Sequence, residues 1–308
     1  MKNSELLNNS IMGKCSICPR NCGVDRAAGQ IGFCKSTATV RVARAALHMW
    51  EEPCISGEAG SGAVFFSGCN LRCVFCQNQD IASGLAGKDI SIERLSQIFM
   101  ELQDKGANNI NLVTPSHYVP QIADALDIVR DTLNIPVVYN SSAYENVDTL
   151  RLMEEHVSIY LPDFKYYSDE LAKRYSNAAD YRQIAISAID EMLRQAGEPE
   201  FDADGIMKRG VIIRHLVLPG ATEDSKKLIK LLYDRYGNSV YYSIMSQFTP
   251  LGHLIENDEY KELHRKLSRR EYDEVVDYAI DLGIENGFIQ EEDVADESFI
   301  PAFDGEGV

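Results

Sequence analysis

The residues with the clearest capacity for chemistry are eight cysteines, all of which lie within the first 76 residues of the 308-residue chain. They form two closely spaced groups, with Cys54 alone between them. Disulfide frameworks are typical of small secreted domains, whereas a large chain with its thiols in two tight groups is typical of metal binding in a reducing compartment. We therefore expect two metal-binding groups, and we expect Cys54 to be a small buried apolar residue.

The second group lies in the segment SGCNLRCVFCQNQ (67–79), where Cys69, Cys73 and Cys76 have the spacing C-x3-C-x2-C. Three thiolates on one short loop can hold three irons of a [4Fe–4S] cluster, which leaves the fourth iron open to a substrate or cofactor. The alternative is a zinc knuckle completed by a distant His or Cys, because a structural zinc site needs a fourth ligand. The spacing and the context favour the cluster.

The first group has the spacing C-x2-C-x3-C-x11-C and consists of Cys15, Cys18, Cys22 and Cys34. Four thiolates can close a site completely, around either a zinc ion or a second [4Fe–4S] cluster. Spacing does not choose between these metals, and unligated thiols are a third alternative. Zinc would make this region a structural staple, whereas iron would permit an electron relay.

The elements that must position these groups are strands and helices that alternate from residue 63 onward. Apolar runs predict strands at 63–67, 110–114, 136–140, 157–165, 210–220 and 239–246. Helical spacing and flanking residues predict helices at about 92–105, 118–133, 146–155, 180–196 and 223–236. Ser91 and Thr222 are expected to cap two of these helices, and later helical segments are expected to break near Ser268. A short strand is expected near 286–290.

This alternation predicts an α/β fold with a parallel sheet, and six units fit a partial (β/α)6 barrel of the TIM type better than a complete eight-unit barrel. The Cys69 loop follows the first strand, at the edge where such folds place their active sites. We expect an irregular Cys-rich metal-binding region over 1–62, the partial barrel over 63–290, and a solvated acidic tail over 291–308.

The cysteine loop, with Phe75 before its last cysteine, resembles the signature of the radical S-adenosylmethionine (SAM) superfamily. The segments GSGAVFFSGCNLRCVFCQN, NLVTPSHYVPQI, YLPDFKYY, RHLVLPG and SIMSQFTPLG are similar to successive blocks of its PflX-type subfamily, relatives of pyruvate formate-lyase-activating enzyme. The resemblance covers about 60–255. It implies a radical SAM fold, a [4Fe–4S] cluster whose open iron chelates SAM, and reductive cleavage of SAM to a 5′-deoxyadenosyl radical. An electron donor such as flavodoxin or ferredoxin is implied as a partner.

The resemblance also implies site residues. Asp163 and Lys165 match an Asp-x-Lys pattern near SAM, and the lysine is expected to pair with the SAM carboxylate. Asn140 is expected to offer a polar contact to the ribose. In relatives, the segment that corresponds to 114–117 carries a carboxylate that contacts SAM. This chain has no carboxylate in that segment, and we expect His117 to lie in the SAM site.

Further expectations concern two histidines near strand ends and one pair of acidic residues. His117 and His215 lie at or near strand ends and are candidates for acid–base or substrate contacts. The Glu51–Glu52 pair is expected to be solvated.

Composition limits the function classes. The chain has 30 basic and 47 acidic residues, a net charge of −17, which argues against a nucleic-acid-binding surface. No apolar run is long enough for a membrane span and no secretory signal is visible, so we expect a cytoplasmic protein.

The leading prediction is a radical SAM oxidoreductase that abstracts hydrogen from a protein, peptide or small molecule. One version of it activates a glycyl radical enzyme. The activating enzymes carry a Gly-x-Arg segment before the cluster, and GSGAVFFSGC lacks the arginine, which weighs against that version. The alternative from another class is a non-catalytic metal-binding scaffold with a degenerate barrel.

Overall fold

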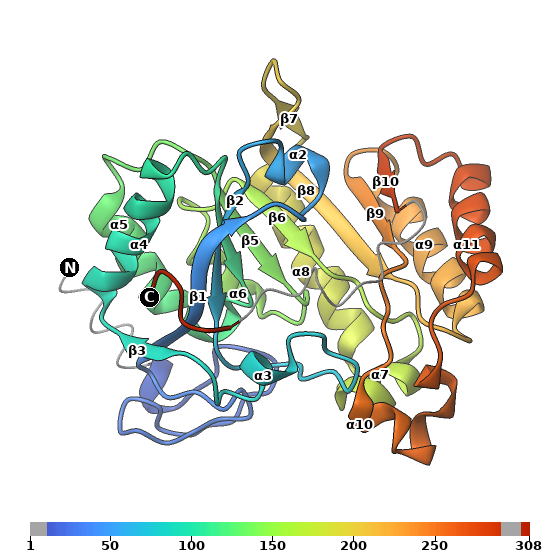
Figure 1. Cartoon of the computed structure of the whole chain (residues 1–308), viewed down its shortest axis with the longest axis horizontal. Coiled ribbons are helices and arrows are strands. Elements are labelled where there is room, and N and C mark those ends of the chain that lie inside the picture. The colour runs from blue at the N-terminus through green and yellow to red at the C-terminus, as the bar shows by residue number, and fades with distance from the viewer. Residues whose placement is uncertain (1–10, 291–302) are drawn as a thin grey trace.

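The strands predicted from residue 63 onward pair side by side in one curved sheet. The computed structural model describes residues 11–290 and 303–308. The parallel strands are β2 (Ser61–Phe66), β4 (Ile110–Val113), β5 (Val137–Ser141), β6 (Ile159–Pro162), β8 (Met207–Leu216), β9 (Tyr241–Met245) and β10 (Gly287–Ile289). They follow one another in chain order and the sheet runs as an open path from β10 to β3. The predicted partial barrel is confirmed (Figure 1).

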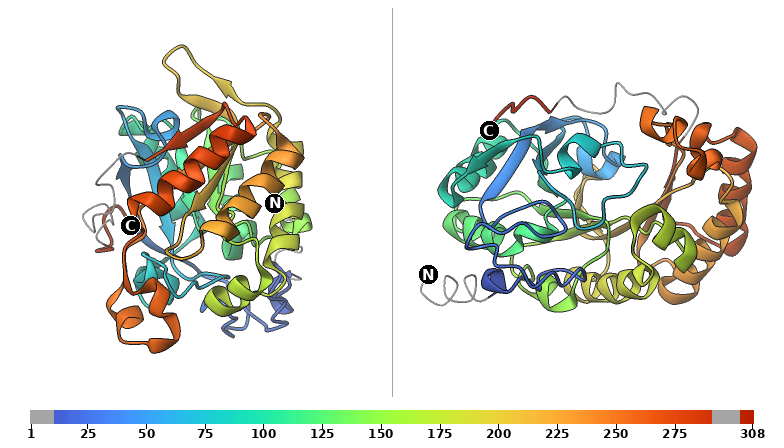
Figure 2. Two further views of the ribbon diagram at one scale, coloured as in Figure 1. Left: turned by 90° about the vertical axis from the view of Figure 1, so that its right-hand side faces the viewer. Right: turned by 90° about the horizontal axis from the view of Figure 1, so that it is seen from below.

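Helices cover the outer face of this sheet, as both views of Figure 2 show. The longer ones are α4 (Ile92–Asp104), α5 (Val119–Val129), α6 (Val147–Arg151), α7 (Asp169–Ser176), α8 (Tyr181–Ala196), α9 (Thr222–Tyr236) and α11 (Arg269–Leu282). Shorter elements are α2 (Pro53–Ser56), α3 (Gln79–Ala82), α10 (Gly252–Ile255), β7 (Glu200–Phe201) and the 3₁₀ turns Ser116–Tyr118 and Asp258–His264. These bounds agree with the predicted alternation.

Local capping explains where two of the predicted helices begin. The Ser91 side chain accepts a hydrogen bond from the Arg94 N–H at 3.1 Å, which satisfies one of the free donors at the start of α4. Ser268 and Glu271 form a capping box at the start of α11, and this is the predicted break. Thr222 is wrong as a cap, because it is the first residue of α9 and Ala221 precedes it without a side-chain bond.

The N-terminal region contains a strand that the sequence did not predict. β1 (Val40–His48) runs antiparallel to β2 and pairs at its start with β3 (Lys88–Ile90). The expectation of irregular structure over 1–62 is therefore wrong for Val40–His48. The strand covers the edge of β2, whose six residues are all buried.

The end of the chain also packs on β1. The Ala45 N–H donates to the Glu306 carbonyl at 2.9 Å, and Arg44 forms ion pairs with Asp304 and Glu306. This contact occupies the part of β1 that β3 leaves unpaired, so backbone groups there find partners. The Asp304 and Glu306 side chains are nevertheless exposed, as predicted for a solvated tail, while residues 291–302 lie outside the described residues.

The two faces of the sheet differ because side chains alternate along each strand. Val138, Leu161 and Ile212 form a small apolar cluster with Cys54 and Ile55 of α2. This confirms Cys54 as a buried apolar residue. The cluster fills the inner face near the start of the strands, whereas the long helices cover the other face.

The next inward positions, two residues further along the same strands, are Asn140, Asp163 and Arg214. They stand closer to the C-terminal ends of the strands, so the lining of the barrel changes there from apolar to polar. The cysteine loop begins at the same edge of the sheet.

Candidate active site

The cysteine loop directly follows β2 and turns tightly around its own sulfur atoms. The Leu71 and Arg72 N–H groups point at the Cys69 Sγ at 3.4 and 3.5 Å. Arg72 takes a left-handed backbone conformation, with φ of 56°, to make this turn. Cys73 Sγ accepts a hydrogen bond from the Ser176 hydroxyl at 3.0 Å. Donors therefore surround sulfur atoms that would carry negative charge as thiolates.

Aromatic packing fixes the last cysteine of the loop. Phe75 is buried, and its ring meets the rings of Tyr166, Tyr175 and Phe248 edge-on at centroid distances of 6.1 to 6.3 Å. Edge-to-face contacts at this range are favourable. The aromatic residue before Cys76 thus anchors the loop to segments from three other parts of the chain.

Arg20 also holds the loop, a contact that sequence reasoning missed. Its Nε donates to the Asn70 carbonyl and one Nη to the Ser176 carbonyl, each at 2.8 Å. The guanidinium lies over the Phe33 ring, 4.0 Å from the centroid. The segment between Cys18 and Cys22 therefore holds the cysteine loop of Cys69, Cys73 and Cys76 in place.

The three thiols and Lys165 lie within electrostatic range of one another. Burial raises the pKa of the Cys69 thiol, and burial together with Cys69 and Cys73 raises that of Cys76 to about 12, while Lys165 lowers both. Such thiols ionise readily only when positive charge is brought among them, which iron supplies. The donor set therefore fits the cluster.

Over the described part of the chain, no three His, Cys, Asp or Glu side chains converge as ligands of a single metal ion. The thiolates of a [4Fe–4S] cluster bind different irons, so they stand farther apart than the ligands of one ion.

A chain of charges leads from the thiols into the barrel. Lys165 Nζ lies 2.9 Å from Asp163 Oδ2, and Asp163 Oδ1 lies 2.8 Å from Arg214 Nε. Burial opposes ionisation of Asp163, but Arg214 and Lys165 outweigh it and lower its pKa. Burial likewise opposes the charge on Lys165, but Asp163, with Cys73 among the other groups, outweighs it and raises its pKa. The structure therefore brings the two predicted residues together beside the cysteine loop.

Arg214 also joins Asn140 and the segment before α2. One Nη donates to Asn140 Oδ1 at 2.6 Å, and the other lies 2.9 Å from Glu51 Oε2. The prediction that Glu51 and Glu52 are solvated is wrong. Glu52 is buried, and burial raises its pKa. Asn140 thus has its amide oxygen engaged by Arg214 in this structure.

Sequence reasoning missed Arg214 and favoured its neighbour His215. His215 points to the helical side, where Nδ1 lies 2.9 Å from the Phe164 carbonyl and Nε2 2.9 Å from Ser225 Oγ of α9. Strand alternation was the available signal, because Arg214 stands two residues from the inward Ile212. The expectation that His215 faces the site is therefore wrong.

His117 lies behind the cysteine loop. It is fully buried, and its Nε2 donates to the Ser67 carbonyl at 2.8 Å. Burial and the nearby Arg26 lower its pKa to about 3, so it is neutral at physiological pH. This hydrogen bond ties the β4–α5 connection to the start of the loop, and His117 does not join Asp163 and Lys165.

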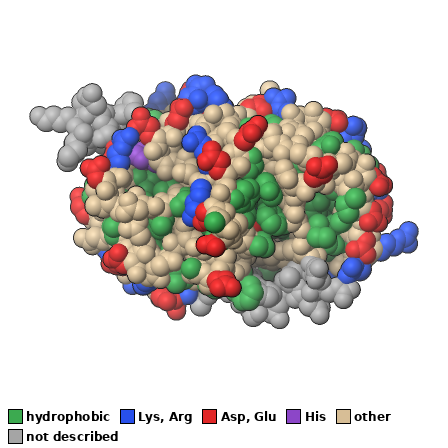
Figure 3. Space-filling model, turned by 90° about the horizontal axis from the view of Figure 1, so that it is seen from above, with side chains coloured by type: hydrophobic (Ala, Val, Ile, Leu, Met, Phe, Trp, Pro, Cys, Tyr) green, Lys and Arg blue, Asp and Glu red, His purple; other side chains and the backbone are tan. Residues whose placement is uncertain are grey.

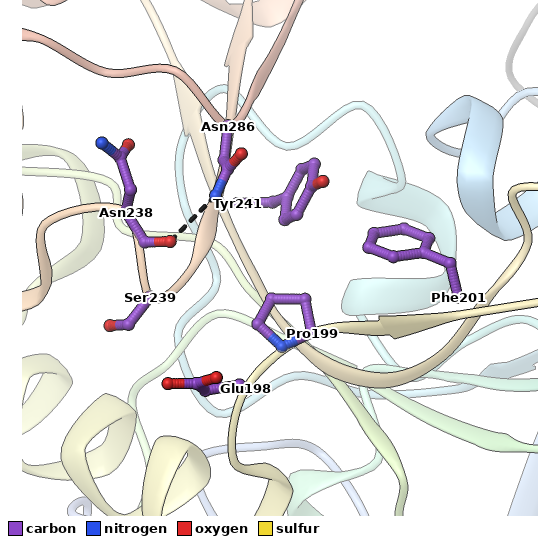
Figure 4. Close-up of a pocket in the computed structure, with 7 residues that line it drawn as sticks. All are labelled: Glu198, Pro199, Phe201, Asn238, Ser239, Tyr241 and Asn286. Carbon is purple, nitrogen blue, oxygen red and sulfur yellow. Dashed lines mark hydrogen bonds between the residues drawn. The ribbon is translucent and has the colours of Figure 1, made fainter.

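The pocket in Figure 4 is a separate feature, with a volume of about 370 Å³. Its lining includes Phe201 of β7, Asn238 and Tyr241 at the start of β9. Because the strands are parallel, the start of β9 and the end of β2 lie at opposite ends of the barrel. Figure 3 shows the end of the barrel at which the parallel strands start, where acidic and apolar side chains are intermingled. This pocket is therefore remote from the cysteine loop.

Comparison with known proteins agrees with this geometry. The model of the Radical SAM superfamily matches residues 63–232, more than half of the chain. The chain therefore belongs to the radical SAM superfamily. Its cofactors are a [4Fe–4S] cluster and SAM, and its chemistry is that of an enzyme that cleaves SAM to generate a radical.

Individual relatives are more distant. The chain is 29% identical over 280 residues to the uncharacterized protein MJ0674 of Methanocaldococcus jannaschii, a match that covers 88% of this chain and 75% of that protein. Structures of Streptococcus suis SuiB bound to the precursor peptide SuiA and to SAM each have a TM-score of 0.51, at 15% and 14% identity. They cover 74% and 72% of this chain. The chain spans about half the length of SuiB, 47% and 48% in the two structures, and the likeness shows the fold.

No helix within the described ranges is both long and apolar enough to cross a membrane.

Proposed function

We propose that Cys69, Cys73 and Cys76 hold the [4Fe–4S] cluster and that Lys165 binds the carboxylate of SAM beside its open iron. The main support is the position of Lys165. Its positive charge lowers the pKa values of the Cys69 and Cys76 thiols, and Asp163 stabilises that charge through an ion pair. An ammonium group in this place complements a carboxylate and disfavours a neutral ligand.

Neighbouring residues prepare this site. When bound, the reduced cluster supplies the electron that cleaves SAM to a 5′-deoxyadenosyl radical, which abstracts hydrogen from the substrate. Asp163 holds the Lys165 ammonium in place, and Arg214 keeps Asp163 ionised through a 2.8 Å contact. The aromatic rings around Phe75 exclude water from one side of the loop.

The substrate is proposed to be polar, because Asn140, Arg214 and Glu51 form a hydrogen-bonded network on the inner face of the barrel. Proteins, peptides and small molecules all remain within this class, and the PflX-type segments keep glycyl radical activation as one version. Flavodoxin or ferredoxin is the proposed class of electron donor.

Electron paramagnetic resonance of the anaerobically reconstituted and reduced protein tests this proposal. SAM is expected to change the cluster signal of the wild type, because it binds the open iron. Cys73→Ala is expected to lose the signal that responds to SAM, whereas the control Cys54→Ala, whose thiol lies in the apolar cluster under α2, is expected to retain it. A wild-type cluster whose signal is indifferent to SAM would contradict the proposal.

A further inference from the structure

The N-terminal cysteines form a second cluster of thiols close to the first. Cys15 and Gly23 pair through their backbones, with the Cys15 N–H bonded to the Val24 carbonyl and the Gly23 N–H to the Cys15 carbonyl, each at 2.9 Å. This pairing brings Cys15 beside Cys22. Three of the four thiols, those of Cys15, Cys18 and Cys34, are buried although no disulfide joins them.

Gly32 shows how close two of these sulfur atoms approach. A Cβ at Gly32 would lie 3.5 Å from Cys22 Sγ and 3.7 Å from Cys34 Sγ, so the glycine stands between them. The Phe33 N–H points at Cys22 Sγ at 3.3 Å. This repeats the pattern at Cys69, where backbone N–H groups also face a sulfur atom.

Arg26 gives an independent observation. Its side chain is 1% exposed, and among the described residues no carboxylate forms an ion pair with it. Its Nη groups donate to the His117 and Thr37 carbonyls at 2.7 and 2.6 Å, and its Nε has no hydrogen-bond partner. One Nη lies 4.0 Å from Cys15 Sγ.

A buried cation without a counter-ion is costly, by several kcal/mol in general, so an anion is expected nearby. The nearest groups that can supply one are the cysteines. Four thiolates around a [4Fe–4S] cluster in its oxidised form carry a net charge of about −2.

We propose that Cys15, Cys18, Cys22 and Cys34 hold a [4Fe–4S] cluster whose negative charge is balanced by Arg26. A single zinc ion would need thiols that converge on one point, and among the described residues no such group is present. This centre touches the active-site loop directly, because the Cys69 N–H donates to the Cys34 carbonyl at 3.2 Å. Ser36 reinforces the contact, since its hydroxyl lies 3.3 Å from both the Cys34 and the Ser67 carbonyls. The centre therefore positions the first ligand of the other group.

Metal analysis of a variant without the active-site thiols tests the proposal. Cys69, Cys73 and Cys76 are all replaced by Ala, so the result does not depend on the function proposed above. The full chain is purified anaerobically and loaded with either iron and sulfide or zinc. We expect about four irons with sulfide per chain, whereas one zinc per chain in preference to iron would overturn the cluster.

Two additional changes in that background locate the site. Cys18→Ala is expected to lose the metal, whereas Cys54→Ala is expected to keep it. Arg26→Met is expected to release the metal to a chelator about 10- to 100-fold more readily, the usual effect of losing a residue that supports metal ligands. Arg130→Met, which breaks an exposed ion pair with Glu155, is the matched control and is expected to have no effect.

The proposal is overturned if the background variant, folded by circular dichroism, does not retain iron and sulfide in stoichiometric amount. It is also overturned if Cys18→Ala keeps the full metal content. Circular dichroism of each variant shows whether loss of metal follows from unfolding. Arg26→Met keeps all four thiols, so a rate of metal release equal to that of the control would overturn the role proposed for Arg26.

Discussion

Replacement of Lys165 by Ala is the most informative change near the proposed SAM site. Its ammonium is the cation felt by the loop thiols, and it lies 2.9 Å from Asp163 Oδ2. A charge-assisted hydrogen bond to the SAM carboxylate is worth about 1.5–3 kcal/mol, so its loss raises the dissociation constant of SAM roughly 10- to 150-fold. The fold is expected to survive, because Asp163 keeps its 2.8 Å contact with Arg214.

Calorimetric titration of SAM into the reconstituted wild type and variant measures this effect, and iron analysis confirms equal cluster content. Lys208→Ala is the matched control, because Lys208 forms a similar 2.8 Å pair with Asp202 on the hairpin that contains β7. That control is expected to leave SAM affinity unchanged. Equal affinities of wild type and Lys165→Ala, at equal iron content, would refute the reasoning and leave the Asp163–Lys165 pair as a local ion pair.

Other changes test the surrounding structure. Burial lowers the pKa of His215 to about 4, so the unfolded chain, with a pKa near 6.5, binds the proton more readily, and the contribution is full above pH 6.5 and lost as pH falls toward 4. Between pH 7.5 and 5, the free energy of unfolding in urea is expected to fall by about 2 kcal/mol more for the wild type than for His215→Gln. The fully buried His117, whose pKa is also lowered, contributes equally to both proteins, so equal losses would count against His215 as the cause. Ser91→Ala removes the hydrogen bond from the Arg94 N–H and is expected to lower the free energy of unfolding by about 1 kcal/mol in the same urea assay. An unchanged free energy of unfolding would mean that the cap does not stabilise the protein. Arg20→Met removes the bond to the Asn70 carbonyl and is expected to hasten iron loss to a chelator, followed by absorbance; an unchanged rate would show that the brace is dispensable.

The fold was largely predictable because its strands have strong local signals. Strands β2 and β4, which the apolar runs at 63–67 and 110–114 predict, are buried on both faces, as in most parallel sheets, and helical periods separate them. β1 was missed because its sequence, VRVARAALH, contains two arginines and follows an irregular Cys-rich segment. Its strand state depends on pairing with β2, which local sequence does not report.

The candidate site was predictable where chemistry and spacing coincide, and less so where tertiary contacts decide. The C-x3-C-x2-C spacing and the two-residue separation of Asp163 and Lys165 are local features. Arg214 and Glu51 are 163 positions apart in the chain and meet only through the curvature of the sheet. Arg20 likewise reaches the cysteine loop across 50 positions.

The central claim is that this chain cleaves SAM at a cluster held by Cys69, Cys73 and Cys76. Its most direct test is the formation of 5′-deoxyadenosine from SAM by the anaerobically reconstituted, reduced protein. The account predicts product from the wild type and from Cys54→Ala, and none from Cys73→Ala. Product formation by Cys73→Ala at the wild-type rate, or no product from a wild type with its full iron content, would contradict it.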